Sequence, residues 1–310
     1  MTSSASGKAG ERNGAADASK PEPDALPIPT GLPAPGLHLV ATPIGNLSDI
    51  SLRALAVLRG ADRIYCEDTR VTGKLLARFG VKARLEAYHD HNAEAVRPKI
   101  IAALKDGARV ALVSDAGTPL VSDPGYKVVS AAIAEHLPVT ATPGPSALLT
   151  ALVLSGLPPA PFLFAGFLPR QQMARRQALA GWVSLDATLV FYEAAPRLAA
   201  TLADMAEILG PRPASVAREL TKLHEEIRRG ALAELAEHCR ETGAPRGEIV
   251  IVVGPPEPPA LLDEHEIDDR LRIAVAELGV RDASARLATE TGLRRSQLYR
   301  RALALREEEG

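Results

Sequence analysis

Three loops rich in Gly, Pro, Ser and Thr constrain the fold of this chain more than any other feature. They lie at residues 42–47, 114–125 and 142–147, and each follows a short apolar stretch. Each also leads towards a segment with helical spacing. A repeated order of strand, loop and helix is typical of a parallel α/β sheet, where ligands bind at the carboxyl ends of the strands. The loops therefore predict a binding surface built largely from main-chain N–H and C=O groups.

The apolar segments between residues 37 and 254 predict two α/β domains, at 36–157 and 158–254, with Pro158–Pro161 as the boundary. Periodicity in the first domain indicates a mainly parallel sheet. Its expected strands are 37–41, 61–66, 84–88, 109–113 and 139–141, and its expected helices are 51–59, 74–79, 93–105, 127–135 and 146–154. In the second domain we expect strands at 162–167, 188–192, 214–218 and 248–253, and helices at 171–182, 197–209 and 231–240.

The two ends of the chain depart from this pattern. Residues 1–35 are polar and rich in Ala, Ser and Gly, without the apolar core of a signal peptide, so we expect a disordered tail. A Pro-rich linker is expected at 255–262 and a helical segment at 263–310. Short Gly turns separate the helices expected in that segment, and this is the outline of a helix-turn-helix.

The composition excludes several classes of protein. A formal net charge of −2 gives no overall basic field for nucleic acid, so any RNA contact must come from local patches. The two cysteines, Cys66 and Cys239, lie far apart and lack the spacing of metal ligands, which favours a reduced, cytoplasmic protein. The longest apolar stretch, 147–168, is interrupted by Gly156 and three Pro residues at 158, 159 and 161, so we expect no membrane span.

The first loop matches neither of the common nucleotide-binding motifs. It lacks the three-glycine spacing of a dinucleotide fingerprint and the Gly-Lys-Ser/Thr of a phosphate loop, so neither NAD nor ATP is supported. Polar groups at 67–70 and 89–92 follow the second and third strands and predict the lining of a substrate cleft, although solvated loop charges are the alternative. His89 and His91 have no evident third ligand, and we expect no metal site.

An ordered set of motifs resembles one known family. The motifs are TPIGNL at 42–47, EDTR at 67–70, HDHN at 89–92, SDAGTP at 114–119, SDPG at 122–125, TPGPSA at 142–147, FYE at 191–193 and RELTK at 218–222. Together they closely resemble the bacterial ribosomal RNA small subunit methyltransferase I family of the tetrapyrrole methylase superfamily. The resemblance covers about residues 36–254, and the tail is similar to the family's C-terminal helix-turn-helix region.

The resemblance implies a two-domain α/β fold that binds S-adenosylmethionine in the cleft between the domains. It also implies 2′-O-methylation of a cytidine ribose in 16S rRNA of the small ribosomal subunit, by an enzyme that is commonly a homodimer. The cofactor-binding residues that it implies are Pro43, Gly45, Asn46, Ser114, Asp115, Ala116, Gly117, Leu120, Ser122, Pro145, Ser146 and Ala147.

Methyl transfer to a hydroxyl gains from a base that removes the proton. We predict that Lys222 and Glu225 do this, because they lie on the second domain and would face the cofactor across the cleft. With Glu226 they also have the spacing of one helical face. A surface helical pair is the alternative reading of that spacing. Glu226, Asp68 and His89 are further candidates for the base.

Local clusters of arginine predict RNA contacts. We expect phosphate contacts from Arg170, Arg175, Arg176, Arg294, Arg295, Arg300 and Arg301. The alternative for the tail is an Arg-rich helical cap on the second domain.

Two other functions remain open at this point. A tetrapyrrole C-methyltransferase of the precorrin type would share the fold and the cofactor, although its substrate needs no helix-turn-helix. A DNA-binding regulator that senses a metabolite would use the tail to read duplex DNA.

Overall fold

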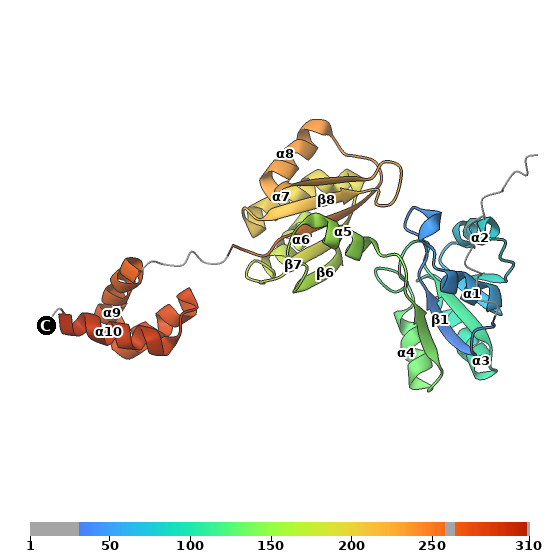
Figure 1. Ribbon diagram of the computed structural model, residues 1–310, viewed down its shortest axis with the longest axis horizontal. Coiled ribbons are helices and arrows are strands. Elements are labelled where there is room, and N and C mark those ends of the chain that lie inside the picture. The colour runs from blue at the N-terminus through green and yellow to red at the C-terminus, as the bar shows by residue number, and fades with distance from the viewer. Residues whose placement is uncertain (1–30, 258–263, 309–310) are drawn as a thin grey trace, which may run out of the picture.

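A computed structural model of the chain describes residues 31–257 and 264–308 (Figure 1). The expected disordered tail at 1–35 and the expected linker at 255–262 lie outside these ranges, except for residues 31–35 and 255–257. Among the described residues, no helix is both long enough and apolar enough to cross a membrane.

The N-terminal sheet is parallel throughout, as expected. Its order is β3-β2-β4-β1-β5, and each adjacent pair of strands runs in the same direction. The strands are β1 (Gly36–Val40), β2 (Arg63–Cys66), β3 (Leu85–Ala87), β4 (Arg109–Val113) and β5 (Val139–Thr142). Helices on both faces bury the central strand β4, whose aliphatic residues 110–113 are at most 3% exposed.

Side-chain caps mark the start of several helices in this domain. The elements are η1 (Leu47–Asp49), α1 (Leu52–Gly60), α2 (Thr69–Arg78), α3 (Ala93–Lys105), α4 (Tyr126–Ala134) and α5 (Ala147–Ser155). Helix α2 begins five residues before the expected Lys74, because the Asp68 carboxylate accepts a hydrogen bond from Arg70 N at 2.8 Å and caps the helix. Helix α5, although it follows β5, packs through Ala151 and Leu152 on the second sheet.

The C-terminal sheet is mixed, with the order β6-β7-β10-β8-β9. Its strands are β6 (Phe162–Phe167), β7 (Thr188–Ala194), β8 (Pro213–Arg218), β9 (Glu226–Ala231) and β10 (Glu248–Val253). Only β6 and β7 pair in parallel. Helices α6 (Gln172–Ala180), α7 (Leu198–Leu209, entered through η2 at Ala195–Arg197) and α8 (Leu232–Thr242) cover one face, and α5 covers the other.

The helix expected around residue 222 does not form. Residues 219–225 make a loop between β8 and β9 in which Glu219 (φ 50°) and Thr221 (φ 64°) adopt left-handed conformations. Glu226 then begins strand β9, so the prediction that Lys222, Glu225 and Glu226 share a helical face is wrong. Left-handed residues break the repeat that a helix requires.

The C-terminal segment contains a long bent helix followed by a shorter one. Helix α9 (Glu264–Thr291) is broken at Gly279, whose φ of 77° and ψ of 161° are not helical, and α10 (Arg295–Glu308) follows a turn at Gly292. A small core that includes Leu271, Leu287 and Leu298 joins them. The expected helix-turn-helix outline is confirmed.

Candidate active site

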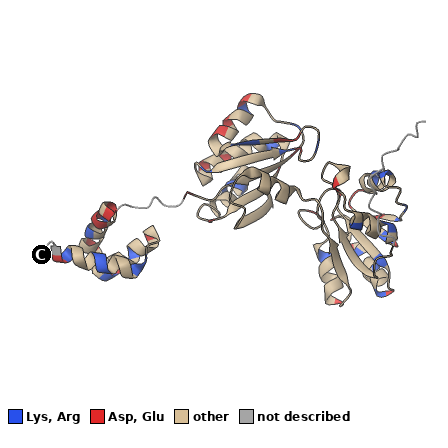
Figure 2. Ribbon diagram, viewed as in Figure 1, with Lys and Arg blue, Asp and Glu red and all other residues tan. Residues whose placement is uncertain are grey.

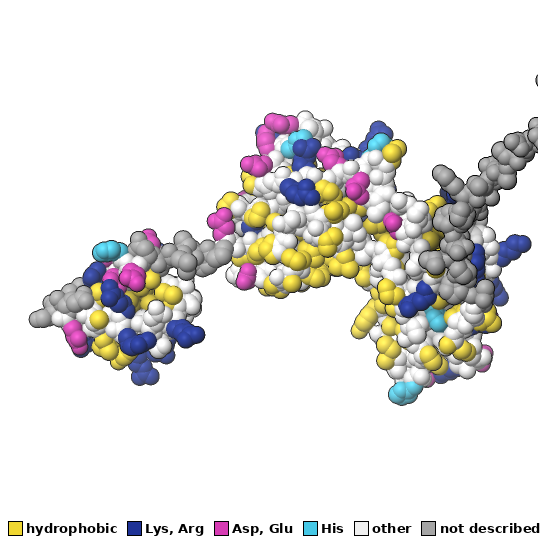
Figure 3. All heavy atoms as spheres, viewed as in Figure 1, with side chains coloured by type: hydrophobic (Ala, Val, Ile, Leu, Met, Phe, Trp, Pro, Cys, Tyr) yellow, Lys and Arg dark blue, Asp and Glu magenta, His cyan; other side chains and the backbone are white. Residues whose placement is uncertain are grey.

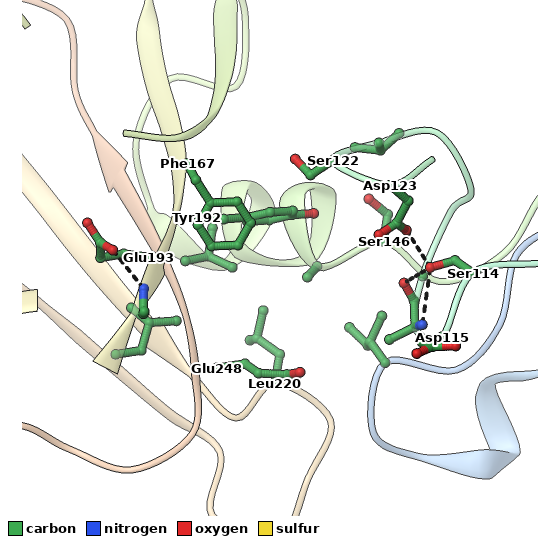
Figure 4. Close-up of a pocket in the computed structure, with 18 of the residues that line it drawn as sticks. Ser114, Asp115, Ser122, Asp123, Ser146, Phe167, Tyr192, Glu193, Leu220 and Glu248 are labelled. Carbon is green, nitrogen blue, oxygen red and sulfur yellow. Dashed lines mark hydrogen bonds between the residues drawn. The ribbon is translucent and has the colours of Figure 1, made fainter. Parts of the chain in front are cut away.

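A pocket of about 580 Å³ lies between the two sheets (Figure 4). Its N-terminal wall comes from the loops after β1, β4 and β5, and its C-terminal wall comes from β6, β7, β10 and the loop before β9. The polar or aromatic side chains labelled in the pocket are Ser114, Asp115, Ser122, Asp123, Ser146, Phe167, Tyr192, Glu193 and Glu248.

Gly117 joins the three loops that the sequence singled out. Its N–H donates to Thr42 O at 3.0 Å, and its carbonyl accepts from Thr42 N at 2.9 Å. A Cβ at this position would lie 3.4 Å from Ile44 and 3.8 Å from Pro145 O, and the φ of 80° favours glycine. The loops therefore form one connected wall.

The same wall carries an acidic pair. Ser114 Oγ donates to Asp123 Oδ2 and accepts from Ala116 N at 3.2 Å, while Asp115 Oδ1 accepts from Asp68 N at 3.1 Å. Burial raises the pKa of Asp123; the hydrogen bond from Ser114 lowers it and the charge of Asp115 raises it further, so the net shift is upward. Because this pKa is raised, a cation bound next to Asp123 would stabilise the ionised form of its carboxyl group.

The opposite wall combines aromatic rings with a buried carboxylate. The Tyr192 ring packs edge-on against Phe164 and Phe167, with ring centroids 4.9 and 5.6 Å apart. Glu193 accepts hydrogen bonds from Ala194 N at 2.7 Å and Thr201 Oγ1 at 2.6 Å. These contacts hold both side chains of β7 rigidly at the pocket.

The loop at 219–225 closes against the first glycine loop. Asn46 N donates to Thr221 Oγ1 at 3.1 Å. A Cβ at Gly45 would overlap Lys222 Cγ and would lie 2.8 Å from Thr221 Oγ1, so only glycine permits this close approach. Gly45 and Asn46 therefore join the N-terminal and C-terminal walls beside the pocket.

Lys222 is held as a cation between two carboxylates. Its Nζ lies 2.7 Å from Glu219 Oε1 and 2.7 Å from Glu248 Oε2. Burial lowers the pKa of Lys222, but the hydrogen bonds and charges of Glu219 and Glu248 outweigh burial, and the net pKa is raised. Glu225 accepts from Thr221 N at 2.6 Å and supports the loop from within. In this arrangement Lys222 keeps its proton at neutral pH, whereas a base must be deprotonated.

Seven of the twelve expected cofactor residues line the pocket. They are Ser114, Asp115, Ala116, Gly117, Ser122, Ser146 and Ala147. The other five, Pro43, Gly45, Asn46, Leu120 and Pro145, are not among its lining residues, although Ile44 between Pro43 and Gly45 is.

Part of the C-terminal wall was not expected from the sequence. Leu220, Gly247, Glu248 and Val250 line the pocket, and none of them was an expected cofactor residue. Gly247 and Glu248 follow a Gly- and Pro-containing segment at 243–246, but nothing in the sequence places that segment beside the loops of the N-terminal domain. The motifs at 191–193 and 218–222 were the available signal for β7 and Leu220.

The polar groups at 67–70 and 89–92 lie at the same edge of the N-terminal sheet but outside the pocket lining. Burial raises the pKa of Glu67, and the charges of Asp115, Asp123 and Asp90 raise it further. His89 Nδ1 is buried without a hydrogen-bond partner. Among the residues that the structure describes, no three His, Cys, Asp or Glu are grouped so as to hold a metal ion.

The expected RNA-binding arginines divide into two groups. Arg175 is 5% exposed and pairs with Asp204 at 2.6 Å, so it belongs to the core and not to the surface patch that we expected. Arg176 pairs with Asp204 and Glu207, and Arg301 pairs with Asp268. Three of the tail arginines, Arg294, Arg295 and Arg300, are exposed, and the basic residues that Figure 2 shows along α10 are all arginine.

Comparisons with known proteins identify the family. The profile of the Tetrapyrrole (Corrin/Porphyrin) Methylases matches residues 36–236, and that of the RsmI C-terminal HTH domain matches 262–306. A ribosomal RNA small subunit methyltransferase I from Mesorhizobium japonicum is 50% identical over 285 residues, covering 91% of this chain and 96% of its own length. One from Erythrobacter litoralis is 52% identical over 273 residues, covering 88% and 96%.

A solved structure shows the same fold. The uroporphyrin-III C-methyltransferase of Thermus thermophilus, in complex with S-adenosyl homocysteine, superposes with a TM-score of 0.51 at 19% identity, over 71% of this chain and 97% of that one. The sequence relatives and the fold agree. This chain belongs to the tetrapyrrole methylases, and within them to the ribosomal RNA small subunit methyltransferase I family of S-adenosylmethionine-dependent methyltransferases.

Proposed function

We propose that this chain transfers a methyl group from S-adenosylmethionine to the ribose 2′-oxygen of a cytidine in 16S rRNA of the small ribosomal subunit, in the cytoplasm. The charge of the pocket carries the proposal. Asp115, Asp123, Glu193 and Glu248 line it, and none of its described lining residues is Lys, Arg or His. Arg197 and Lys222, which lie outside the lining, pair with Glu193 and Glu248, so the acidic character of the pocket comes from Asp115 and Asp123. An acidic pocket favours a cationic cofactor over an RNA phosphate.

The pocket suits this cofactor in size and chemistry. Its volume of about 580 Å³ lies within the usual range for small-molecule sites. We propose that the carbonyl oxygens of Ala116 and Gly117, each of which can accept a second hydrogen bond, hold polar donors of the cofactor. Ile44, Phe167 and Leu220 would form the apolar walls. The five expected cofactor residues that do not line the pocket would contribute by shaping its loops; they are Pro43, Gly45, Asn46, Leu120 and Pro145.

The bound cofactor supplies an electrophilic methyl group on a sulfonium. The chain must then align the 2′-oxygen with that methyl and exclude water. The closed contact between Gly45 and Lys222 at the side of the pocket supports both tasks. Lys222, with Glu225 bracing its loop, acts in this proposal as a positioning residue that fixes the Glu248 carboxylate at the pocket.

RNA would meet cationic side chains outside the pocket. Arg294, Arg295 and Arg300 lie exposed on or beside α10, and Arg170 is exposed next to α6. We propose that these side chains, with Arg176 and Arg301 from their ion pairs, contact phosphates. A local set of this kind reconciles RNA binding with a net charge of −2.

The chain would act as a homodimer. Large apolar side chains are exposed on three helices, with Tyr126 (74%) on α4, Val153 (72%) on α5 and Met173 (84%) on α6. Figure 3 shows apolar side chains gathered over the C-terminal sheet and α4. Apolar exposure on this scale is typical of a protein interface, and a second copy of the chain is the occupant that we propose.

A comparison of methyl acceptors tests the proposal. Labelled S-adenosylmethionine is offered with small ribosomal subunits that lack the modification, with free 16S rRNA and with a porphyrinogen. We expect label on RNA and none on the porphyrinogen. Label on the porphyrinogen alone would overturn the proposal in favour of a tetrapyrrole methyltransferase.

A further inference from the structure

A second cavity lies on the helical side of the C-terminal sheet. Its volume is about 370 Å³, and it is formed by the adjoining ends of β8 and β9, the second half of α8 and the chain after it. The polar lining includes Arg218, Glu226, Arg228 and His238, and the apolar lining includes Val216 and Leu235. This cavity has no part in the cofactor pocket.

The cavity carries a surplus of positive charge. Arg218 Nη2 lies 3.0 Å from Glu226 Oε2, and Arg228 Nη2 lies 2.9 Å from Glu226 Oε1. Two guanidinium groups thus share one carboxylate, and each keeps further N–H groups beyond its ion pair. The Arg228 side chain is 45% exposed and is accessible to a ligand. The net charge of this lining is therefore opposite in sign to that of the cofactor pocket.

The two cavities lie along one row of the sheet. Across that row, Glu193 of β7 pairs with Ile249 of β10, Ile249 pairs with Arg218 of β8, and Arg218 pairs with Glu226 of β9. Glu193 and Ile249 line the cofactor pocket, whereas Arg218 and Glu226 line the second cavity. Three strand spacings of about 4.8 Å put the two ends of the row about 14 Å apart.

The segment after α8 separates the two cavities. Gly243 and Pro245 line the second cavity, and Gly247 and Glu248 line the cofactor pocket. Arg218 Nη1 donates to Arg246 O at 3.2 Å and fixes this segment between them. The segment 243–248 therefore borders both cavities, and a ligand that extends from one along this segment reaches the other within a short distance.

We infer that the second cavity binds a nucleotide of the RNA substrate next to the one that is methylated. Its phosphate would lie on Arg228 and Arg218, where planar guanidinium groups bind phosphate oxygens well. Its base or sugar would lie against Val216 and Leu235. The inference rests on the proposed function, because it assigns a subsite to the same RNA.

The test compares two arginines that differ in their relation to the cavity. Arg228→Ala removes a guanidinium that lines the cavity. Arg240→Ala is the matched control, because Arg240 lies on α8 outside the cavity lining, where it pairs with Glu237 of the same helix at 2.5 Å. For each full-length variant, KM for small ribosomal subunits is measured at several salt concentrations, with Kd for S-adenosylmethionine and the melting temperature as controls.

We expect Arg228→Ala to raise KM for the subunits about tenfold and to lower its salt dependence, with Kd for the cofactor unchanged. Arg240→Ala should leave KM near the wild-type value. Arg228→Lys, which keeps a positive charge beside Glu226, should recover part of the loss and covers the case in which the alanine variant is unstable.

Equal values of KM for both alanine variants and the wild type would overturn the inference while leaving the proposed function intact. Failure of the wild-type chain to methylate RNA would instead overturn the proposed function, and the inference with it. Wild-type activity is therefore measured first.

Discussion

Lys222 Nζ and Glu248 Oε2 lie 2.7 Å apart, and this ion pair links the loop between β8 and β9 to the strand that borders the cofactor pocket. Lys222 also contacts Gly45 of the N-terminal wall. One side chain thus connects three segments that are far apart in the sequence. Its raised pKa means that this connection depends on a positive charge.

Replacement of Lys222 separates a positioning role from proton transfer. Lys222→Met should lower kcat about 10- to 100-fold, because Glu248 loses its partner and the pocket loses its closed side. Lys222→Arg should keep most of the activity, since arginine retains the charge but does not lose its proton in proteins. An equally inactive arginine variant with unchanged cofactor affinity would contradict the positioning role and restore the prediction of Lys222 as the base.

Cofactor binding should depend on pH through Asp123. Its pKa is raised in the folded protein, mainly by burial, so the carboxyl takes up a proton at a higher pH than the usual value of about 4. A cationic ligand binds the ionised form better, so the affinity for S-adenosylmethionine should rise as pH increases through this raised pKa. Calorimetry should also detect protons released on binding.

Asp123→Asn provides the matched control, because it keeps the shape of the side chain and removes its charge. The variant should bind S-adenosylmethionine more weakly with a flatter pH profile. S-adenosylhomocysteine lacks the sulfonium charge, and its affinity should change less. Identical pH profiles for the wild type and Asp123→Asn would refute the role of this carboxylate.

Arg175 should govern stability and not RNA affinity. Its side chain is 6% exposed and pairs with Asp204, which is 3% exposed. Arg175→Met leaves a buried carboxylate with weaker compensation and should lower the free energy of unfolding by about 3 kcal/mol. The neighbouring Arg176→Met should cost less than about 1 kcal/mol, because Arg176 is one-third exposed.

Urea denaturation measures this difference between the two arginine variants. Binding to small ribosomal subunits at a temperature at which both are folded should be unchanged for Arg175→Met. A loss of RNA affinity without a loss of stability would show that Arg175 contacts RNA after all.

The C-terminal helices should contribute to RNA binding but not to cofactor binding. Helices α9 and α10 have their own small core, so removal of residues 261–310 leaves both sheets intact. The truncated chain should bind S-adenosylmethionine normally but bind small ribosomal subunits more weakly. The salt slope should fall by about 0.7–0.9 for each phosphate that the truncated chain no longer neutralises. An unchanged affinity for subunits would mean that the helices serve another purpose.

Much of the fold could be predicted because buried parallel strands are short aliphatic runs. The expected bounds of β4, β6, β10 and α3 match the structure residue for residue. Strand β9 was missed because it lies at the edge of its sheet and reads Glu-Ile-Arg-Arg-Gly-Ala, without an apolar alternation. An edge strand leaves little signal when its side chains face solvent.

The N-terminal wall of the pocket was also predictable, because Gly, Pro and Ser mark loops whatever surrounds them. Gly247 and Glu248 reach the pocket only through the pairing of β10 between β7 and β8, which no local pattern reveals. Lys222 and Glu225 have helical spacing, but the left-handed residues Glu219 and Thr221 give the loop another shape. Spacing likewise does not tell a buried cation such as Arg175 from an exposed one.

The position of the transferred methyl group tests the central claim most directly. Subunits that lack the modification are methylated with labelled S-adenosylmethionine, and their 16S rRNA is digested with nuclease and with alkali. A 2′-O-methyl group blocks alkaline cleavage at its own nucleotide, so the account predicts label in an alkali-resistant dinucleotide that begins with cytidine. Label on a base, on another nucleotide or on no RNA at all would contradict it.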